Sequence, residues 1–371
     1  MFPIGYAVVT VDNTPVAALP SSVYSYAQIW TSFTMNPQML FVISAPRSGS
    51  TMLERMLESH SAILGGPEPH LLTPLAHLGP WAKVDKAPYD HILAAESQRH
   101  FIDRLPDGEA DYWRACRAYC DTLYGKLMDG TDKTVCLDKT PAYALVLPFM
   151  MKVYPDAKYV VLTRNPLATF SSFANSFFDG DYAAAQDHNP LLERYVPALA
   201  AVLQQDDVPR IHVRYEDLVQ DPEASMKRIY EYIGVPFEAE TIDYGSRKPA
   251  VDHGKGLGDP IGVQQHSRPS TGSIEKWVDE LAADEAKRKM MQGILATLDP
   301  ADMKSIGYPA DEIWKPLEEA GVRPVPKTPK LTRYRLQRKL IVRLRSLARS
   351  NATVRGWLKK MQLASDVLLR E

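Results

Sequence analysis

The residues best suited to chemistry in this 371-residue chain form a turn of small residues, Pro46-Arg47-Ser48-Gly49-Ser50-Thr51. An apolar run over 40–44 precedes the turn, and apolar residues at helical spacing follow it over 50–58. Backbone N–H groups at the start of such a helix bind anions, because the positive end of the helix dipole lies behind them. The pattern predicts a strand, an anion-binding loop and a helix, with the anion held by Arg47, Ser48, Gly49, Ser50, Thr51 and Met52.

This loop differs from the Walker A loop of nucleotide hydrolases, because it lacks the leading Gly and the Lys before Ser or Thr. A second anion signal follows the apolar run 158–163. Arg164 stands where a Walker B strand would end in a magnesium-holding Asp, and Ser171 and Ser172 come about two helical turns later. Together the segments predict a site that binds a phosphorylated ligand through cations and hydroxyls, without a metal ion.

The elements that must position these segments alternate between short apolar runs and longer helical patterns. Alternation at this spacing is typical of an α/β fold, here a P-loop-like parallel sheet flanked by helices on both faces. The expected strands cover 40–44, 159–163 and 211–214, and the expected helices cover 50–58, 110–128, a stretch from about 167, a stretch before 208, and 223–234.

The remaining segments are expected to surround one main domain. Residues 1–36 are predicted to form an N-terminal arm, 37–321 the domain itself, and 322–371 a basic amphipathic C-terminal helical tail. Segment 244–271 is rich in Gly, Pro and His and has little periodicity, which favours a functional loop. A helix with Ser273 as its N-cap is expected to follow.

Composition limits the class of protein. An apolar content of 45% is enough for a large core, and a net charge of -2 argues against a general nucleic-acid binder. Three cysteines, Cys116, Cys120 and Cys136, suggest neither a disulfide framework nor a zinc site. The sequence shows no secretion signal and no run long enough to span a bilayer, so we expect a cytoplasmic protein.

Taken together, these motifs resemble the sulfotransferases that use 3′-phosphoadenosine 5′-phosphosulfate (PAPS). The turn 46–51 resembles their 5′-phosphosulfate loop, and Arg164 with Ser172 resembles their 3′-phosphate pair. The segments 214–218 and 233–237 are also typical of the family, and the resemblance spans roughly 39–298. It implies the sulfotransferase fold, PAPS as donor, 3′-phosphoadenosine 5′-phosphate (PAP) as product, no metal, and further 3′-phosphate donors at Arg268 and Ser273.

The reaction implied by the resemblance needs cations near the oxygen that bridges phosphate and sulfate, where charge develops. Arg47 and Lys139 are the two candidates. Arg47 stands where the cytosolic aryl and steroid enzymes carry Lys, so we expect it to stabilise charge rather than to donate a proton. Lys139 is expected to be the better proton donor, because burial shifts the pKa of a lysine. A solvated loop lysine is the alternative for Lys139.

The acceptor hydroxyl needs a base, and three residues compete for this role. Glu68 resembles the base carboxylate of tyrosylprotein sulfotransferases by its separation from the phosphate loop, and His70 follows it closely. The tract 258–266, together with 67–72, resembles the sulfotransferase domains of polyketide olefin synthases, and His266 matches a functional His of that subfamily. The sequence leaves the choice among Glu68, His70 and His266 open.

The subfamily resemblance implies a β-hydroxyacyl or other secondary-metabolite acceptor, possibly linked to a carrier protein. His70, Arg214 and Arg247 are the candidate substrate contacts. Protein tyrosine, carbohydrate and small phenol or amine acceptors are alternatives. Outside the sulfotransferases, a P-loop kinase and an inactive nucleotide-binding module are the remaining hypotheses.

The C-terminal tail carries a strong positive charge. Between 327 and 371 it has thirteen Lys or Arg residues against Asp366 and Glu371, with leucines at helical spacing. Such a helix either packs on its own domain or contacts an acidic partner, for example a carrier protein, or an anionic membrane surface. Nucleic acid is not expected as a partner, because few aromatic residues are interleaved with the basic ones.

Overall fold

A computed structural model describes residues 37–78, 91–205, 209–246 and 267–320, together with residues 351, 353, 356 and 357. The chain divides into two units, Met1–Asn36 and Pro37–Glu371, and all described residues belong to the second. The predicted N-terminal arm, nearly all of the predicted tail, and the candidate residues Arg247 and His266 lie outside the described residues.

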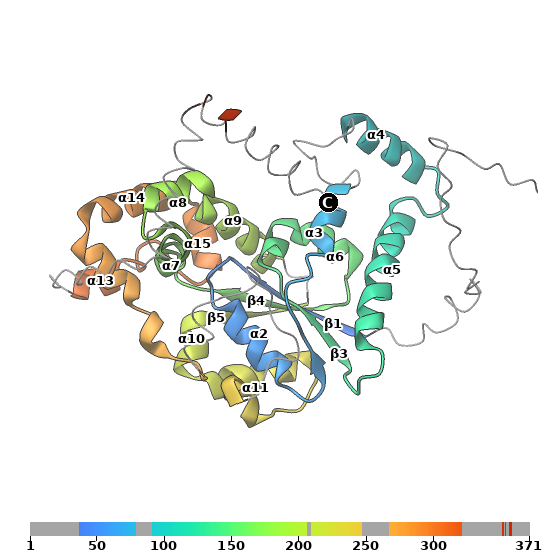
Figure 1. The fold of residues 1–371 in the computed structure, drawn as a ribbon, viewed down its shortest axis with the longest axis horizontal. Coiled ribbons are helices and arrows are strands. Elements are labelled where there is room, and N and C mark those ends of the chain that lie inside the picture. The colour runs from blue at the N-terminus through green and yellow to red at the C-terminus, as the bar shows by residue number, and fades with distance from the viewer. Residues whose placement is uncertain are drawn as a thin grey trace, which may run out of the picture. The chain divides into compact units, whose positions relative to one another are not determined.

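Five parallel strands form the sheet at the centre of this unit (Figure 1). Their spatial order is β2-β3-β1-β4-β5, so the strand that leads into the phosphate loop is central. The strands are β1 (Gln38–Ser44), β2 (Ile63–Leu64), β3 (Val135–Asp138), β4 (Lys158–Thr163) and β5 (Arg210–Arg214). The prediction of a parallel α/β sheet is confirmed, but β2 and β3 were not predicted as strands.

Helices cover both faces of the sheet, as predicted, because side chains of a strand alternate between its two faces. In β1, Leu40 and Val42 pack into one apolar cluster with α2 (Ser50–Glu58), α10 (Tyr215–Gln220) and α11 (Pro222–Ile233). Met39, Phe41 and Ile43 pack into the other cluster. That cluster includes α3 (Leu72–Leu78), α5 (Glu109–Met128), α6 (Leu147–Val153), α7 (Pro166–Phe178), α8 (Tyr182–His188) and α9 (Leu191–Leu203).

Several predicted helices begin and end where their capping residues dictate. Asp221 accepts a hydrogen bond from the Ala224 N–H at the start of α11, and Gly234 ends this helix with a φ of 92°. Helix α2 has the predicted bounds, and α5 begins at Glu109, one residue before its predicted start. The predicted stretches from 167 and before 208 correspond to α7 and α9.

The C-terminal part of the unit differs from the prediction at Ser273. A short 3-10 turn, η4 (Thr271–Ser273), comes first, and Ser270 caps it by accepting a hydrogen bond from the Gly272 N–H. The next helix starts only at Lys276, so the N-cap assignment of Ser273 was wrong. The helices of this part are α13 (Lys276–Ala283), α14 (Glu285–Leu295), α15 (Pro300–Ser305) and α16 (Lys315–Ala320).

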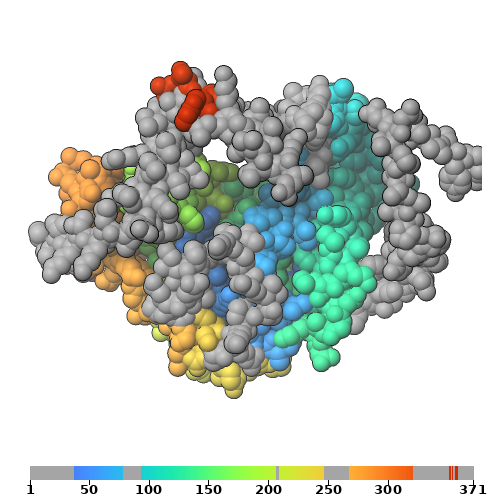
Figure 2. Space-filling view, viewed as in Figure 1, coloured from blue at the N-terminus to red at the C-terminus, as the bar shows by residue number. Residues whose placement is uncertain are grey.

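The two flanks of the unit differ in sequence origin. Figure 2 shows α4 (His91–Ile102) and α5, in teal and green, on one flank, and α13 and α14, in orange, on the opposite flank.

The three cysteines, Cys116 and Cys120 in α5 and Cys136 in β3, are buried and carry free thiols. Among the described helices, none is long and apolar enough to cross a membrane.

Phe41 gives a direct test of this packing. Its ring contacts those of Tyr143, Tyr154 and Tyr159 at centroid distances of 6.3, 5.4 and 5.6 Å, and it is fully buried. We expect Phe41→Ala to lower the free energy of unfolding by about 3–5 kcal/mol through lost burial and a cavity, measured by urea denaturation. Phe101→Ala is the matched control, because the Phe101 side chain is 62% exposed. An equal loss in both variants would contradict this packing.

Candidate active site

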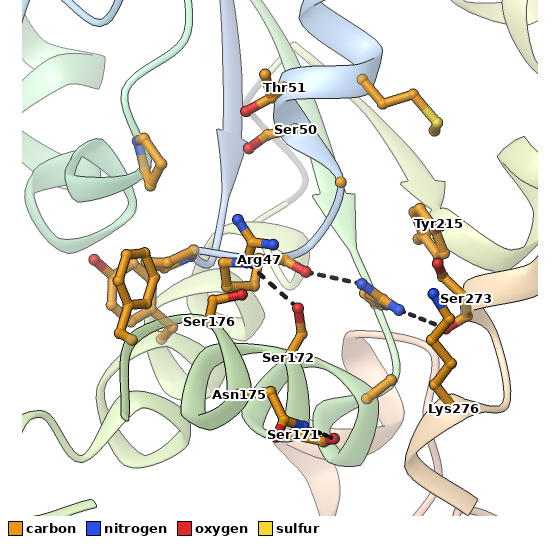
Figure 3. A pocket seen from close by; sticks show the side chains of 18 of the residues that line it. Arg47, Ser50, Thr51, Ser171, Ser172, Asn175, Ser176, Tyr215, Ser273 and Lys276 are labelled. Carbon is orange, nitrogen blue, oxygen red and sulfur yellow. Dashed lines mark hydrogen bonds between the residues drawn. The ribbon is translucent and has the colours of Figure 1, made fainter. Parts of the chain in front are cut away.

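A cavity of about 510 Å³ lies at the carboxyl ends of the strands, where open parallel sheets bind ligands. Four segments distant in sequence supply most of its lining: the loop 46–52, the loop carrying Glu68 and His70, helix α7, and the segment 268–277. The other described lining residues are Pro141, Ala142, Arg164, Tyr195, Tyr215 and Tyr244. Figure 3 shows Arg47, Ser50 and Thr51 on one side and Ser171, Ser172 and Asn175 of α7 on another, with Ser273 and Lys276 opposite.

The loop between β1 and α2 has the backbone of an anion cradle. Gly49 has a φ of 91° and Arg47 a φ of 68°, so two of its residues are left-handed. In the described part of the chain, the N–H groups of Gly49, Ser50 and Thr51 find no acceptor, whereas that of Ser48 bonds to the Ala45 carbonyl at 3.3 Å. Unpaired N–H groups at a helix start are the donors that phosphate and sulfate groups bind.

Tyr215, the first residue of α10, packs against this loop and fixes its position. A Cβ atom at Gly49 would lie 2.5 Å from Cδ2 and 2.7 Å from Cε2 of the Tyr215 ring, so only glycine fits there. The Arg164 guanidinium lies over the same ring, 4.3 Å from its centroid. The same aromatic ring therefore contacts both the loop, at Gly49, and Arg164.

Arg164 crosses the site and joins two of its walls. Its Nη1 donates to the Arg47 carbonyl at 3.1 Å, and its Nη2 donates to the Ser273 carbonyl at 2.7 Å (Figure 3). The third donor, Nε, is buried and has no hydrogen-bond partner among the described residues. Burial lowers the pKa of Arg164 from its ordinary value because it penalises the charged form. An anion in the cavity would supply the missing negative charge.

Helix α7 supplies the hydroxyl groups opposite the loop. Asn165 caps the helix by accepting from the N–H groups of Leu167 and Ala168. The Ser172 Oγ accepts a hydrogen bond from Arg47 Nε at 3.3 Å, while the Ser171 hydroxyl is bonded to Glu280 instead. Of the two serines, Ser172 is thus the one that meets Arg47 (Figure 3).

Glu68 faces the cavity from the loop after β2. Its side chain is 13% exposed, and its Oε1 accepts a hydrogen bond from Lys139 Nζ at 2.5 Å. The other carboxylate oxygen lies 3.6 Å from His70 Nε2, and His70 has a left-handed φ of 53°. Glu68 and His70, predicted as neighbours of one site, therefore line the same cavity.

Lys139 lies behind Glu68 rather than in the cavity. Its side chain is fully buried and is not among the groups that line the cavity. Burial lowers the pKa of Lys139, but the neighbouring carboxylates of Glu54 and Glu68 raise it by more. The net result is a pKa above the ordinary value for lysine. Lys139 was predicted to be the better proton donor because burial shifts the pKa of a lysine. Here the two carboxylates outweigh the burial, so the shift is upward and does not favour proton donation.

Sequence reasoning missed Glu54. This residue lies on the buried side of α2, with Leu53, Met56 and Leu57 as buried neighbours. Its Oε2 is 3.2 Å from Lys139 Nζ, and burial raises its pKa to about 8, although the charge of Lys139 lowers it. An acidic residue within the apolar face of a predicted helix was the available signal.

The remaining predicted residues have different fates. Arg268, Ser273 and Met52 line the cavity, and Arg268 forms an ion pair with Asp243 at 2.9 Å. Arg214 does not line it: its guanidinium lies 4.8 Å from the centroid of the Tyr308 ring. The contact with Tyr308 gives Arg214 a structural role, and the position of Arg214 does not support the predicted substrate contact.

The predicted family is confirmed by comparison with known sequences. A profile described as "Sulfotransferase family" matches residues 37–239, more than half of the chain. This chain belongs to the sulfotransferase family. The matched segment includes the phosphate loop, Glu68, Lys139, Arg164 and Ser172, and it ends before the segment 268–277 that closes the cavity.

Individual relatives are distant. Nodulation protein NoeE of Sinorhizobium fredii is 27% identical over 269 residues, which cover 67% of this chain and 62% of that protein. Protein-tyrosine sulfotransferase A of Caenorhabditis elegans is 23% identical over 217 residues, which cover 55% of this chain and 52% of that protein. The chain thus matches less than two thirds of the length of either relative.

A solved structure is also similar in fold. The sulfotransferase domain of the olefin synthase from Synechococcus PCC 7002 has 26% sequence identity and a TM-score of 0.44, and the match covers 66% of this chain and 89% of that domain. At this TM-score the likeness adds nothing to the family assignment, which rests on the sequence profile.

Gly49 allows a test of the loop geometry. We expect Gly49→Ala to lower the free energy of unfolding by about 2 kcal/mol, because the left-handed backbone disfavours a Cβ atom and Tyr215 occupies its place. Urea denaturation measures this loss. Gly293→Ala in α14 is the control: a Cβ there meets nothing within 4 Å, so we expect no loss. A neutral Gly49→Ala would refute the geometry.

Proposed function

We propose that this chain transfers a sulfuryl group from PAPS to a substrate hydroxyl by in-line displacement. One observation carries the proposal: the unpaired N–H groups of the loop, the unpaired Nε of Arg164 and the carboxylate of Glu68 belong to a single cavity or its walls. Such a transfer requires hydrogen-bond donors that bind the anionic leaving group on one side of the reacting group and a base on the other side.

The donor would be held by groups that already lack partners. The loop N–H groups of Gly49, Ser50 and Thr51 suit the 5′-phosphosulfate, and Arg164 with Ser172 suits the 3′-phosphate. When bound, PAPS supplies the activated sulfuryl group. No group of three or more His, Cys, Asp or Glu side chains in the described ranges could hold a metal ion, and the donor set is cationic and hydroxylic.

In this proposal Glu68 accepts the proton of the acceptor hydroxyl. It lines the cavity, it is mostly buried, and Lys139 holds its carboxylate from behind at 2.5 Å. Lys139 thus positions the base instead of donating a proton to the leaving phosphate. Arg47, in the loop itself, is left to stabilise charge that develops on the bridging oxygen. His266 lies outside the described residues and keeps its place as a candidate base.

The acceptor we propose is a β-hydroxyacyl chain or a similar secondary-metabolite hydroxyl, carried on a protein. Support comes from the likeness of segments 67–72 and 258–266 to olefin-synthase sulfotransferase domains. Tyr195, Phe177 and Ala142 add apolar surface to the cavity that contains Glu68. A protein tyrosine is the main competing acceptor, since a protein-tyrosine sulfotransferase is among the relatives.

A screen of acceptors tests the proposed function. The purified chain would be incubated with PAPS and with β-hydroxyacyl carrier proteins, tyrosine peptides, carbohydrates or phenols, and each acceptor would be examined by mass spectrometry for the gain of one sulfuryl group. We expect the gain on the carrier-linked acyl chain. Gain on a tyrosine peptide alone would overturn the acceptor proposal, and failure to bind PAP would overturn the donor proposal.

Glu68→Gln tests the base. We expect kcat to fall by roughly 10²- to 10⁴-fold, because the amide accepts no proton, while the Kd for PAP measured by calorimetry stays unchanged. Glu223→Gln is the matched control, since Glu223 is exposed and pairs with Lys227 on the surface of α11. Full activity of Glu68→Gln would assign the base to another residue, with His266 next in order.

A further inference from the structure

The proposed reaction gives no role to the buried carboxylate of Glu54, which lies beside the same lysine as Glu68. Glu54 is fully buried on α2, and its Oε2 lies 3.2 Å from Lys139 Nζ. The same ammonium group lies 2.5 Å from Glu68 Oε1. A single buried cation therefore serves two carboxylates, and only Glu68 lines the cavity.

Two carboxylates and one ammonium cannot all be charged in a dry site without cost. With both carboxylates ionised, the cluster carries one excess negative charge, and the charge on the fully buried Glu54 would have no contact with water, which is costly. Burial, together with the neighbouring charges of Glu58 and Glu68, raises the pKa of Glu54 to about 8, although Lys139 opposes the shift. At neutral pH Glu54 is then neutral, and Glu68 is the counter-ion of Lys139.

The surrounding groups leave this assignment intact. Glu58, one turn further along α2, is engaged by Arg55 Nη1 at 2.8 Å. On the cavity side, His70 Nε2 lies 3.6 Å from Glu68, and Tyr195 of α9 lines the same cavity. Lys139 on the segment after β3 is therefore the cation that links Glu54 to Glu68.

We propose that Glu54 is a positioning residue that tunes Glu68 through Lys139. When Glu54 is neutral, Lys139 forms its ion pair with the Glu68 carboxylate alone. The full positive charge beside Glu68 then makes this carboxylate a weaker proton acceptor. When Glu54 is ionised, it shares Lys139 and frees Glu68 to accept the proton of the substrate hydroxyl. The inference rests on the proposed role of Glu68, and it gives sulfuryl transfer a dependence on pH that Glu68 alone would not give.

The pH dependence of kcat under saturating substrates tests this coupling. We expect kcat of the natural chain to rise about three- to tenfold with pH, as Brønsted behaviour gives for a neighbouring charge that strengthens a general base. The rise should be centred near the Glu54 pKa of about 8. Glu54→Gln keeps the shape of the side chain but cannot ionise, so the kcat of this variant should stay at the lower level over the whole pH range. Glu58→Gln is the control on the same helix: it should keep the rise, with the midpoint at a lower pH, because the charge of Glu58 helps to raise the pKa of Glu54.

Further measurements make the outcome decisive. Glu54→Met, which also cannot ionise, should give the same flat profile and serves if the Gln variant folds poorly. Infrared spectroscopy should show a protonated carboxyl band at neutral pH that is lost in Glu54→Gln, and this readout needs no turnover. A natural chain that sulfates no acceptor but shows the band would refute the proposed function and leave the charge assignment standing. A rise that persists in both Glu54 variants would overturn the coupling.

Discussion

The contact of one aromatic ring with a glycine is the constraint on which this site depends. Tyr215 begins α10 at the end of β5, and its ring occupies the space that a side chain at Gly49 would need. The ring also contacts the Arg164 guanidinium, at the end of β4. Because the three residues follow three neighbouring parallel strands, the sheet register alone brings them together. The anion loop is therefore placed by its neighbours as much as by its own sequence.

Much of this arrangement was predictable where the signal is local. The loop 46–51 can be recognised from the sequence, because a glycine and hydroxyl residues stand between an apolar run and a helical pattern. The helix that follows it, α2, has the predicted bounds. The resemblance to the sulfotransferases paired Arg164 with Ser172, whereas spacing alone offered Ser171 as well, and all three residues line the cavity. The loop signal is local because the backbone N–H groups at a helix start come from a few consecutive residues. Arg164 and Ser172, by contrast, are held by hydrogen bonds to segments more than a hundred residues away.

The features that were missed depend on contacts between distant segments. Strand β2 has two residues and β3 has four, too few for a periodic pattern, and both exist because β3 pairs with β1. Arg214 has the composition of an anion ligand, but the ring of Tyr308, about a hundred residues away, takes its guanidinium. In the sequence Glu54 is only one charged residue of an amphipathic helix, and its partner Lys139 is brought beside it by the fold. No local pattern encodes these partners.

The charges of the cavity are arranged so that its cationic wall stays available. Arg164 donates to two carbonyl groups, and within the described residues no carboxylate lies at ion-pair distance from it. Glu216, the nearest acidic group in sequence to Tyr215, is instead occupied by the Asn165 N–H and the Tyr308 hydroxyl. On the other wall the carboxylate of Glu68 is neutralised by a buried lysine. An arginine, Arg164, that has no carboxylate at ion-pair distance among the described residues, and a Glu68 carboxylate that Lys139 compensates, together suit an anionic donor while keeping a carboxylate in the same cavity.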